Sequence, residues 1–336
     1  MRPAFSKPAR GLDRGGRDLI KSNQNFHETG VQQMDFLTRR NFIRGAFAAG
    51  TAAFMPPIFA AAAGAKTGRI LFGACLSKKK DVALMKSIGY DFCEGGVSDM
   101  VNPDKNGDWW KKKRDEIRAL PLPVRSLVGF IPGRFRLTGE GLDHEKPLAY
   151  AEKAVRRAAE IGVKYIVLGS GAARNVPGKN PGKDKIEKGM EEFTDFCRKV
   201  AKRIEGIDGV TVVIEPLRRK ECNIVNFVDE GRKIVEAVDS PKVRLLADIF
   251  HMMSGEDKAE SIVKAGSMIK HCHVAEYSTR SFPGDRPGEN RRLKPYFDAL
   301  KKIGYTGGVS CECNWGKAGA TAVKLETTLK TMKGLA

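Results

Sequence analysis

The sequence from residue 69 onward alternates short β-branched runs with amphipathic helical patterns. Such alternation is typical of βαβ units, in which a helix joins two parallel strands. The runs predicted to form strands span residues 69–75, 90–96, 123–130, 163–170, 209–216, 242–249, 269–276 and 307–314. Eight units of this kind fill the length that an eight-fold barrel needs. The sequence therefore predicts an α/β fold, a single (β/α)8 TIM barrel over residues 66–336.

Helical patterns lie between these predicted strands. They cover residues 149–162, 193–209, 226–239 and 293–308, and residues 316–336 supply a final helix. An open, doubly wound sheet is the alternative fold. The segment FGACLSKKK at the first strand lacks the glycine-rich dinucleotide fingerprint of such sheets, so the barrel is the better interpretation.

Four long connections follow the C-terminal ends of predicted strands. Their sequences are NPDKNGDWW, IPGRFRLTGEGLDHEK, GSGAARNVPGKNPGKDK and YSTRSFPGDRPGENRR. In a barrel of this kind the loops at this end of the strands form the active-site face.

The N-terminal part of the chain does not belong to the predicted barrel. Residues 1–33 are polar and aperiodic, and they are interpreted as disordered or as sequence upstream of a true start at Met34. Residues 34–65 contain the pair Arg39 and Arg40, a short apolar stretch broken by two prolines, and small residues at the end. This pattern indicates an export signal and not a membrane-spanning helix. It resembles a twin-arginine (Tat) signal peptide, which implies export of the folded protein to the periplasm or another extracytoplasmic compartment.

Composition limits the partners. The 336 residues have a formal net charge of +19, and removal of residues 1–65, with nine basic and four acidic residues, leaves +14. This charge raises nucleic acid as a partner. The basic runs lie in helix and loop settings where they only solvate the fold, so no nucleic acid is expected. The odd count of seven cysteines disfavours a disulfide scaffold, and no further segment is long and apolar enough for stable membrane insertion.

Four ionisable side chains fall at the same end of consecutive predicted strands: Glu215, Asp248, His273 and Glu312. Carboxylates that converge inside a barrel repel one another unless a cation neutralises them. A divalent metal held by these four groups would neutralise the carboxylates. Three oxygens and one nitrogen suit Mn²⁺, Mg²⁺ or Co²⁺ better than zinc. The alternative is that each acid forms its own salt bridge with a basic side chain of the barrel.

The order of these motifs resembles a known family. EPLRRKE is followed by DIFH, then HVAE, then Glu312 on the last strand. This series is similar to the xylose isomerase-like TIM-barrel superfamily, and within it to the sugar phosphate isomerase/epimerase group that includes D-tagatose 3-epimerase. The resemblance implies one divalent cation, usually Mn²⁺, on Glu215, Asp248, His273 and Glu312. It also implies that Glu215 and Glu312 form the catalytic acid/base pair.

The same resemblance implies that Glu221, His251 and Arg280 contact substrate. Two further substrate contacts are predicted with open alternatives. Glu94 ends the strand 90–96 and either contacts substrate or forms a structural salt bridge, and Trp315 either forms an apolar wall against a sugar or packs a loop.

The expected function is a divalent-metal-dependent sugar epimerase or isomerase that transfers a proton between two glutamates through a metal-bound enediolate. The runner-up is a lyase or dehydratase that uses the same metal site on keto-sugars, keto-glycosides or inososes. A nuclease like the AP endonucleases is disfavoured because strands 90–96 and 123–130 carry no histidine. A non-catalytic sugar binder is disfavoured because binding alone does not need both glutamates. The expected partner is a small sugar or keto-sugar, and a homo-oligomer is left open.

Overall fold

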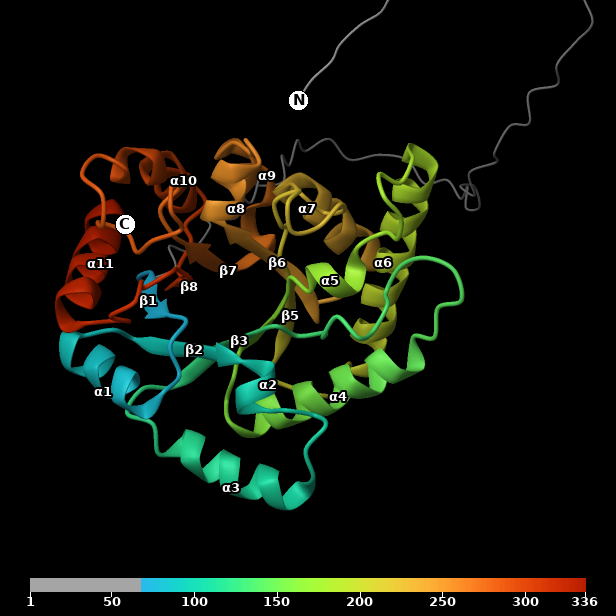
Figure 1. The fold of residues 1–336 in the computed structure, drawn as a ribbon, viewed down its shortest axis with the longest axis horizontal. Helices are drawn as coiled ribbons and strands as arrows, with labels where there is room; N and C mark the ends of the chain where they lie inside the picture. Colours follow the sequence, from blue (N-terminus) through green and yellow to red (C-terminus); the bar gives the residue numbers. More distant parts are fainter. Residues whose placement is uncertain (1–67) are drawn as a thin grey trace, which may run out of the picture. The chain divides into compact units, whose positions relative to one another are not determined.

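Eight parallel strands form a closed barrel in the computed structural model, which describes residues 68–336. The strands are β1 (Leu71–Ala74), β2 (Phe92–Gly96), β3 (Val124–Val128), β4 (Tyr165–Leu168), β5 (Thr211–Ile214), β6 (Val243–Asp248), β7 (Ile269–Val274) and β8 (Gly308–Cys311). Each strand lies inside its predicted range and pairs with the next, and β8 pairs with β1 to close the ring (Figure 1). The predicted (β/α)8 barrel is confirmed. The segments 1–33 and 34–65, with their predicted disorder and export signal, lie outside the described residues.

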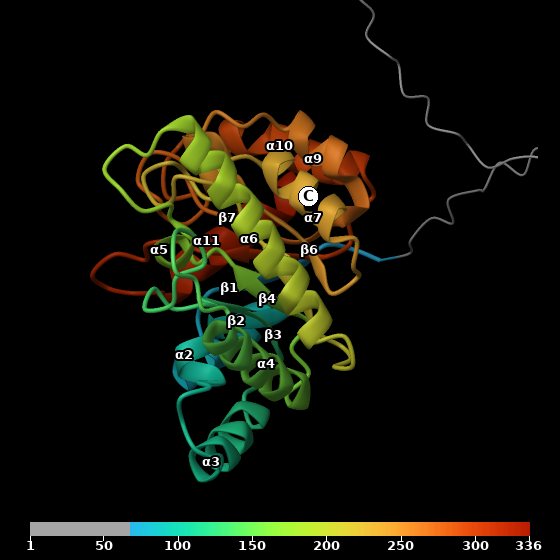
Figure 2. The same cartoon turned by 90° about the vertical axis from the view of Figure 1, so that its right-hand side faces the viewer.

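Helices follow the strands and surround them (Figure 1). They are α1 (Lys79–Ile88), α2 (Val97–Met100), α3 (Gly107–Arg118), α4 (Glu145–Glu160), α5 (Gly171–Arg174), α6 (Lys183–Arg203), α7 (Val228–Val238), α8 (Ile249–Ser254), α9 (Glu260–Ala265), the 3₁₀ turn η1 (Gly266–Met268), α10 (Asn290–Lys302) and α11 (Ala322–Leu335). Neighbouring outer helices pack on one another, and α11 packs between α10 and α1, so the last helix closes the outer ring. Figure 2 shows the long helix α6 along the outside of the barrel.

The structure corrects all four predicted loops, since each ends inside a helix (α3, α4, α6 or α10) and the loop 169–185 also contains α5. NPDKNGDWW already contains the start of α3, which begins at Gly107. The side chain of Asn106 accepts a hydrogen bond from the Trp109 amide at 3.0 Å, as an N-cap residue does. Trp110 is buried and donates from its indole nitrogen to Glu160 of α4 at 3.0 Å. The capping residue and the buried tryptophan together account for a helix where a loop was expected.

Inside the barrel, one side is apolar and the other polar. Val167, Val213 and Leu246 of β4, β5 and β6 form an apolar cluster of their own. On β7, His271 and His273 are fully buried, and their registers match Leu246 and Asp248 on β6. Side chains two apart on a strand share a face. In both the polar and the apolar part of the interior, the inward-facing residues are therefore every second residue of a strand.

Small residues make room for this interior. A side chain at Gly73 on β1 would overlap the ring of Phe92 on β2. Gly308 on β8 leaves space for the same ring and for His271, since an added Cβ would lie 3.0 Å from Phe92 and 3.2 Å from Nδ1 of His271. Substitution at either glycine would push the buried aromatic groups of the barrel floor.

None of the helices in residues 68–336 combines the length and the hydropathy needed to cross a bilayer.

Candidate metal centre

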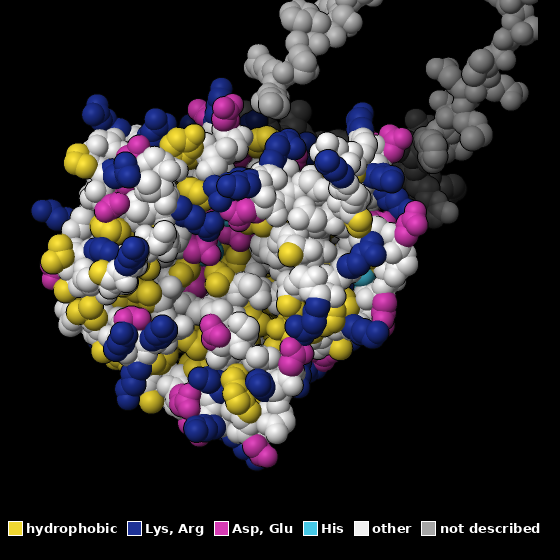
Figure 3. All heavy atoms as spheres, viewed as in Figure 1, with side chains coloured by type: hydrophobic (Ala, Val, Ile, Leu, Met, Phe, Trp, Pro, Cys, Tyr) yellow, Lys and Arg dark blue, Asp and Glu magenta, His cyan; other side chains and the backbone are white. Residues whose placement is uncertain are grey.

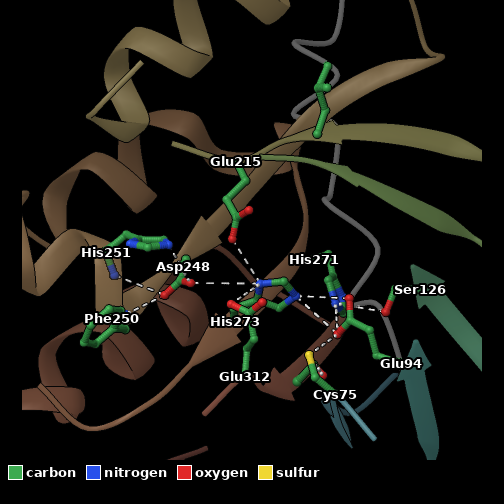
Figure 4. A network of polar contacts seen from close by, with 12 residues as sticks. Cys75, Glu94, Ser126, Glu215, Asp248, Phe250, His251, His271, His273 and Glu312 are labelled. Atoms are coloured by element: carbon green, nitrogen blue, oxygen red, sulfur yellow. Dashed lines mark hydrogen bonds and ion pairs between the residues drawn. The ribbon is translucent and has the colours of Figure 1, made fainter. Parts of the chain in front are cut away.

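The four predicted metal ligands converge at the C-terminal end of the strands. Glu215, Asp248, His273 and Glu312 each offer one ligand atom, and these four atoms all lie within 4.8 Å of one another (Figure 4). Glu215 and Glu312 directly follow β5 and β8, Asp248 ends β6, and His273 lies in β7. Parallel strands that end at one rim of a barrel bring these residues together from four distant parts of the chain.

Asp248 divides its two carboxylate oxygens between a helix and the centre. Oδ1 accepts hydrogen bonds from the backbone amides of Phe250, at 2.7 Å, and His251, at 3.1 Å, and so caps α8. Oδ2 lies 4.0 Å from Nδ1 of His273 and 3.5 Å from Nε2 of His251. The helix cap fixes the carboxylate so that its second oxygen faces the other three ligands.

His273 presents its two ring nitrogens to different groups. Nδ1 lies 3.2 Å from Glu215 Oε1 and 3.7 Å from Glu312 Oε2. Nε2 lies 3.1 Å and 3.2 Å from the two oxygens of Glu94. A proton on Nε2 that is donated to Glu94 leaves Nδ1 as the lone-pair nitrogen that a metal requires.

A glycine opposite Glu215 leaves room for its carboxylate. Glu215 is only 7% exposed, and its backbone carbonyl accepts a hydrogen bond from the buried Arg174 at 2.9 Å. A Cβ at Gly169, at the end of the neighbouring strand, would overlap Oε2 of Glu215. Gly169 therefore sets the space in which the Glu215 side chain turns toward the centre.

Glu312 is the partly exposed member of the cluster, and Arg280 holds it. Nη2 of Arg280 donates to Oε2 of Glu312 at 2.7 Å. Burial raises the pKa of Glu312 to about 7, with the charges of Glu215 and Asp248 adding to the rise and those of His273 and Arg280 opposing it. These carboxylates repel one another, and a divalent cation bound between them would reduce the repulsion.

The donor set fits a divalent cation. Three carboxylates and one imidazole nitrogen supply hard oxygen ligands with one borderline nitrogen, which suits Mn²⁺, Mg²⁺ or Co²⁺. The alternative of separate salt bridges describes the cluster less well. Of the four residues only Glu312 forms an ion pair with an arginine within the described part of the chain, and the ion-pair partners of Glu215 and Asp248 there are imidazoles.

The predicted substrate residues form a chain of contacts beside the cluster. Arg280 Nη1 lies 3.4 Å from Glu221 Oε1, and Glu221 Oε2 lies 3.9 Å from Nε2 of His251. The guanidinium of Arg280 stacks over the ring of Phe250 at 4.8 Å. Arg280 has a left-handed backbone, with φ of 50°, and its carbonyl accepts the amide of Asn314 at 2.7 Å. These contacts hold Glu221, His251 and Arg280 at the mouth of the centre, and their roles toward substrate stay predictions.

Glu94 lies deeper than the other carboxylates. It is fully buried on β2 and ion-pairs with His273 and with His271, whose Nε2 is 3.3 Å from Oε2. Burial opposes the charge of Glu94, but the two imidazoles hold its pKa well below its ordinary value. The structure therefore places Glu94 in a buried ion pair, which is the second of the two alternatives derived from the sequence. His271 also contacts Ser126 Oγ at 3.2 Å, a partner that sequence reasoning did not identify.

Cys75 belongs to a second group of close ligand atoms, with Glu94 and His273. Its thiol donates to Glu94 Oε2 at 3.3 Å. Burial and the charges of Glu94 and Glu312 raise the pKa of this thiol well above its ordinary value, so it remains protonated. In the described structure this group is a hydrogen-bond network in which Glu94 contacts both Cys75 and His273.

Trp315 stacks on Phe282, with ring centroids 5.7 Å apart and planes within 10°, and is 9% exposed. It takes part in the hydrophobic core. This packing agrees with the second alternative derived for Trp315, and contact with a sugar stays a prediction.

Comparison with known proteins gives the family. The model of the xylose isomerase-like TIM barrel family matches residues 82–333. The L-ribulose 3-epimerase of Mesorhizobium japonicum is 34% identical over 240 residues, which are 70% of this chain and 74% of that protein. The chain belongs to the xylose isomerase-like TIM barrel family.

Other known proteins are similar to this chain over shorter stretches or in fold alone. The D-psicose 3-epimerase of Ruminiclostridium cellulolyticum is 35% identical over 126 residues, which are 36% of this chain and about 40% of the length of that relative. A crystal structure of the IolI protein with a bound zinc atom superposes with a TM-score of 0.61 at 20% identity, over 80% of this chain and 97% of that one. The named curated relatives are sugar epimerases, and the solved structure shares the fold.

Proposed function

We propose that this family member is a divalent-metal-dependent sugar epimerase or isomerase that acts on a ketose or related keto-sugar. The observation that carries the proposal is the cluster of Glu215, Asp248, His273 and Glu312, with four ligand atoms within 4.8 Å. The names of the relatives, a D-psicose 3-epimerase and an L-ribulose 3-epimerase, support the reaction class. Mn²⁺ is the cation that the oxygen-rich donor set favours, and the zinc of the related IolI structure supports divalent binding in this family.

A cation at this centre would supply Lewis-acid polarisation of a substrate carbonyl and charge stabilisation for the enediolate. The protein supplies the proton transfers. Glu215 and Glu312 come from β5 and β8, two strands that are not neighbours, yet their carboxylate oxygens approach within 4.8 Å. Two carboxylates on different strands can approach one sugar carbon from its two opposite faces. One removes the proton next to the carbonyl and the other returns a proton to the opposite face, which is epimerisation.

Arg280 and the environment of Glu312 suit this role. Without a cation, burial raises the pKa of Glu312 to about 7, and the positive charge of a bound metal would lower it and favour the ionised carboxylate that takes up a proton. Arg280 holds Oε2 of Glu312 at 2.7 Å and so fixes the orientation in which the proton moves. Glu221 and His251, at the mouth, supply polar groups that can bind sugar hydroxyls.

We also propose export by the twin-arginine route, on the basis of Arg39 and Arg40 and the small-residue stretch that follows them. The test is fractionation of cells that express the full chain, with an Arg39→Lys/Arg40→Lys variant as the control. Retention of the variant in the cytoplasm together with export of the parent supports this route.

The reaction is tested by incubating purified protein and Mn²⁺ with a series of ketoses in D₂O. Deuterium at the carbon next to the carbonyl, together with a new epimer or isomer, is the expected result. Loss of water from the sugar instead would make the protein a lyase. Absence of exchange with every keto-sugar in the series would overturn the proposed function.

A further inference from the structure

A cavity of about 520 Å³ is lined by residues that lie close in sequence to those at the mouth of the metal centre. Its walls come from three segments: the loop after β5, the end of α8 with the turn after it, and the loop after β7. Each of these segments also carries a residue at the mouth of the centre, namely Glu221, His251 and Arg280. The cavity and the mouth of the centre are therefore built from the same three segments, and the cavity volume lies in the range of ligand pockets, roughly 300–1,000 Å³.

Arg218 joins the cavity to the centre. Its Nε donates to Glu221 Oε1 at 2.7 Å, and the same oxygen lies 3.4 Å from Arg280, which holds Glu312. The guanidinium groups of Arg218 and Arg280 lie 4.9 Å and 4.8 Å from the ring centroid of Phe250. Two residues, Glu221 and Arg280, thus connect one wall of the cavity to the predicted metal ligand Glu312.

The charge of the cavity is positive. Arg218, Arg219 and Lys220 line it, and Glu256 is the only carboxylate among the described residues of the lining. Arg218 is paired with Glu221, but within residues 68–336 neither Arg219 nor Lys220 has a hydrogen-bond or ion-pair partner. The other contact of Arg219 is the ring of Phe227, at 5.6 Å. On the face in Figure 3, Lys and Arg side chains lie beside acidic side chains near the middle of the molecule. Two cations without a counter-charge are what an anionic ligand group requires.

We propose that this cavity binds an anionic group of the substrate, so that the sugar taken by the centre is an acidic keto-sugar with a phosphate or carboxylate remote from its carbonyl. The carbonyl end lies at the centre, and the anion lies between Arg219 and Lys220. Tyr277, the exposed aromatic residue of the lining, offers an apolar surface to the carbon chain between them. The inference rests on the proposed function for the position of the carbonyl, and on the cavity alone for the anion.

The test is calorimetric binding to the Mn²⁺-loaded protein of three sugars that differ at one carbon: D-fructose, D-fructose 6-phosphate and D-fructuronate. At least one charged sugar is expected to bind at least about tenfold more tightly than D-fructose, the gain typical of one charge-assisted hydrogen bond. The variant Arg219→Ala/Lys220→Ala is expected to remove that gain and to leave D-fructose binding unchanged. The control Lys80→Ala/Lys86→Ala removes two exposed lysines of α1 that also have no ion pair in the described chain, and it is expected to keep the gain.

The two charged sugars separate a phosphate site from a carboxylate site. Equal binding of all three sugars, binding of none, or a gain that survives the Arg219→Ala/Lys220→Ala change would overturn the inference. If charged sugars bind through these residues while no proton exchange is found in D₂O, the proposed reaction fails and the anion site stands. If D-fructose exchanges normally and charge brings no gain, the reaction stands and the anion site fails.

Discussion

Glu94 lies 3.1 Å from Nε2 of His273, on the side of the ring opposite to the other carboxylates (Figure 4). The pair is completely buried, and burial opposes protonation of His273, but Glu94, Glu215 and Glu312 raise the pKa of this histidine well above its ordinary value. A carboxylate behind a metal-binding imidazole fixes its tautomer and raises its basicity as a ligand. The position of Glu94 therefore prepares the Nδ1 atom of His273 for a cation.

Replacement of Glu94 tests this arrangement. Glu94→Ala is expected to lower the affinity for Mn²⁺ by about 10- to 100-fold, because the ring of His273 loses the partner that orients it. Glu94→Gln keeps an acceptor oxygen and is expected to lose less. Calorimetric titration with Mn²⁺ measures the affinity, with circular dichroism to check folding and Glu191→Gln, an exposed change on α6, as the control. Unchanged affinity in a folded Glu94→Ala protein would show that Glu94 has no part in metal binding.

Gly169 gives a second prediction. Gly169→Ala is expected to displace the Glu215 carboxylate, because the added methyl group would overlap Oε2. Overpacking of this kind costs about 1–3 kcal/mol, and Mn²⁺ affinity should fall as well. Gly206→Ala is the matched control, since a Cβ there meets nothing within 4 Å. Thermal unfolding and Mn²⁺ titration of both variants check the prediction, and equal behaviour of the two would contradict it.

Removal of either glutamate of the proposed acid/base pair should stop proton transfer. Glu215→Gln and Glu312→Gln are each expected to lower the rate of deuterium exchange by roughly 10²–10⁴, the usual contribution of a positioned acid or base. The rates are measured at saturating Mn²⁺, with bound metal counted so that lost binding is not mistaken for lost chemistry. Near-normal exchange in either variant would mean that this glutamate is not the acid or base.

The cation should also stabilise the fold. Mn²⁺ at about 100 times its dissociation constant adds about 2.7 kcal/mol of unfolding free energy, which is roughly 4–5 °C in melting temperature for a chain of this size. Asp248→Ala is expected to abolish the shift, because it removes a ligand. Scanning calorimetry with Mn²⁺ and with EDTA measures the shift. A parent protein that melts at one temperature under both conditions would argue against a cation at this centre.

Much of the barrel could be predicted from local patterns. The eight strands could be located because β-branched runs and helical periodicity alternate from residue 69, and every strand was found in its range. The start of α3 could not be located, because the signal was a single capping asparagine and a tryptophan that packs on a helix distant in sequence. The position at which a helix begins depends on such long-range contacts, whereas the presence of a strand could be predicted from the local pattern alone.

The candidate site divides in the same way. Residues at strand ends, such as Glu215 and Asp248, could be placed together because parallel strands share one rim. The depth of Glu94 could not be predicted, because the register between β2 and β3 shifts at this residue and only the closed barrel sets it opposite His273. The basic cavity also could not be predicted. Arg219 and Lys220 line it together with residues from loops that follow other strands, and the sequence does not show that these loops meet.

The central claim is that one divalent cation lies among Glu215, Asp248, His273 and Glu312. Anomalous diffraction at the manganese edge, from a crystal grown with Mn²⁺, tests it most directly. The account predicts one peak within about 2.0–2.6 Å of a carboxylate oxygen of each acid and of Nδ1 of His273. A map with no peak there, and with the carboxylates turned to separate basic neighbours, would contradict it.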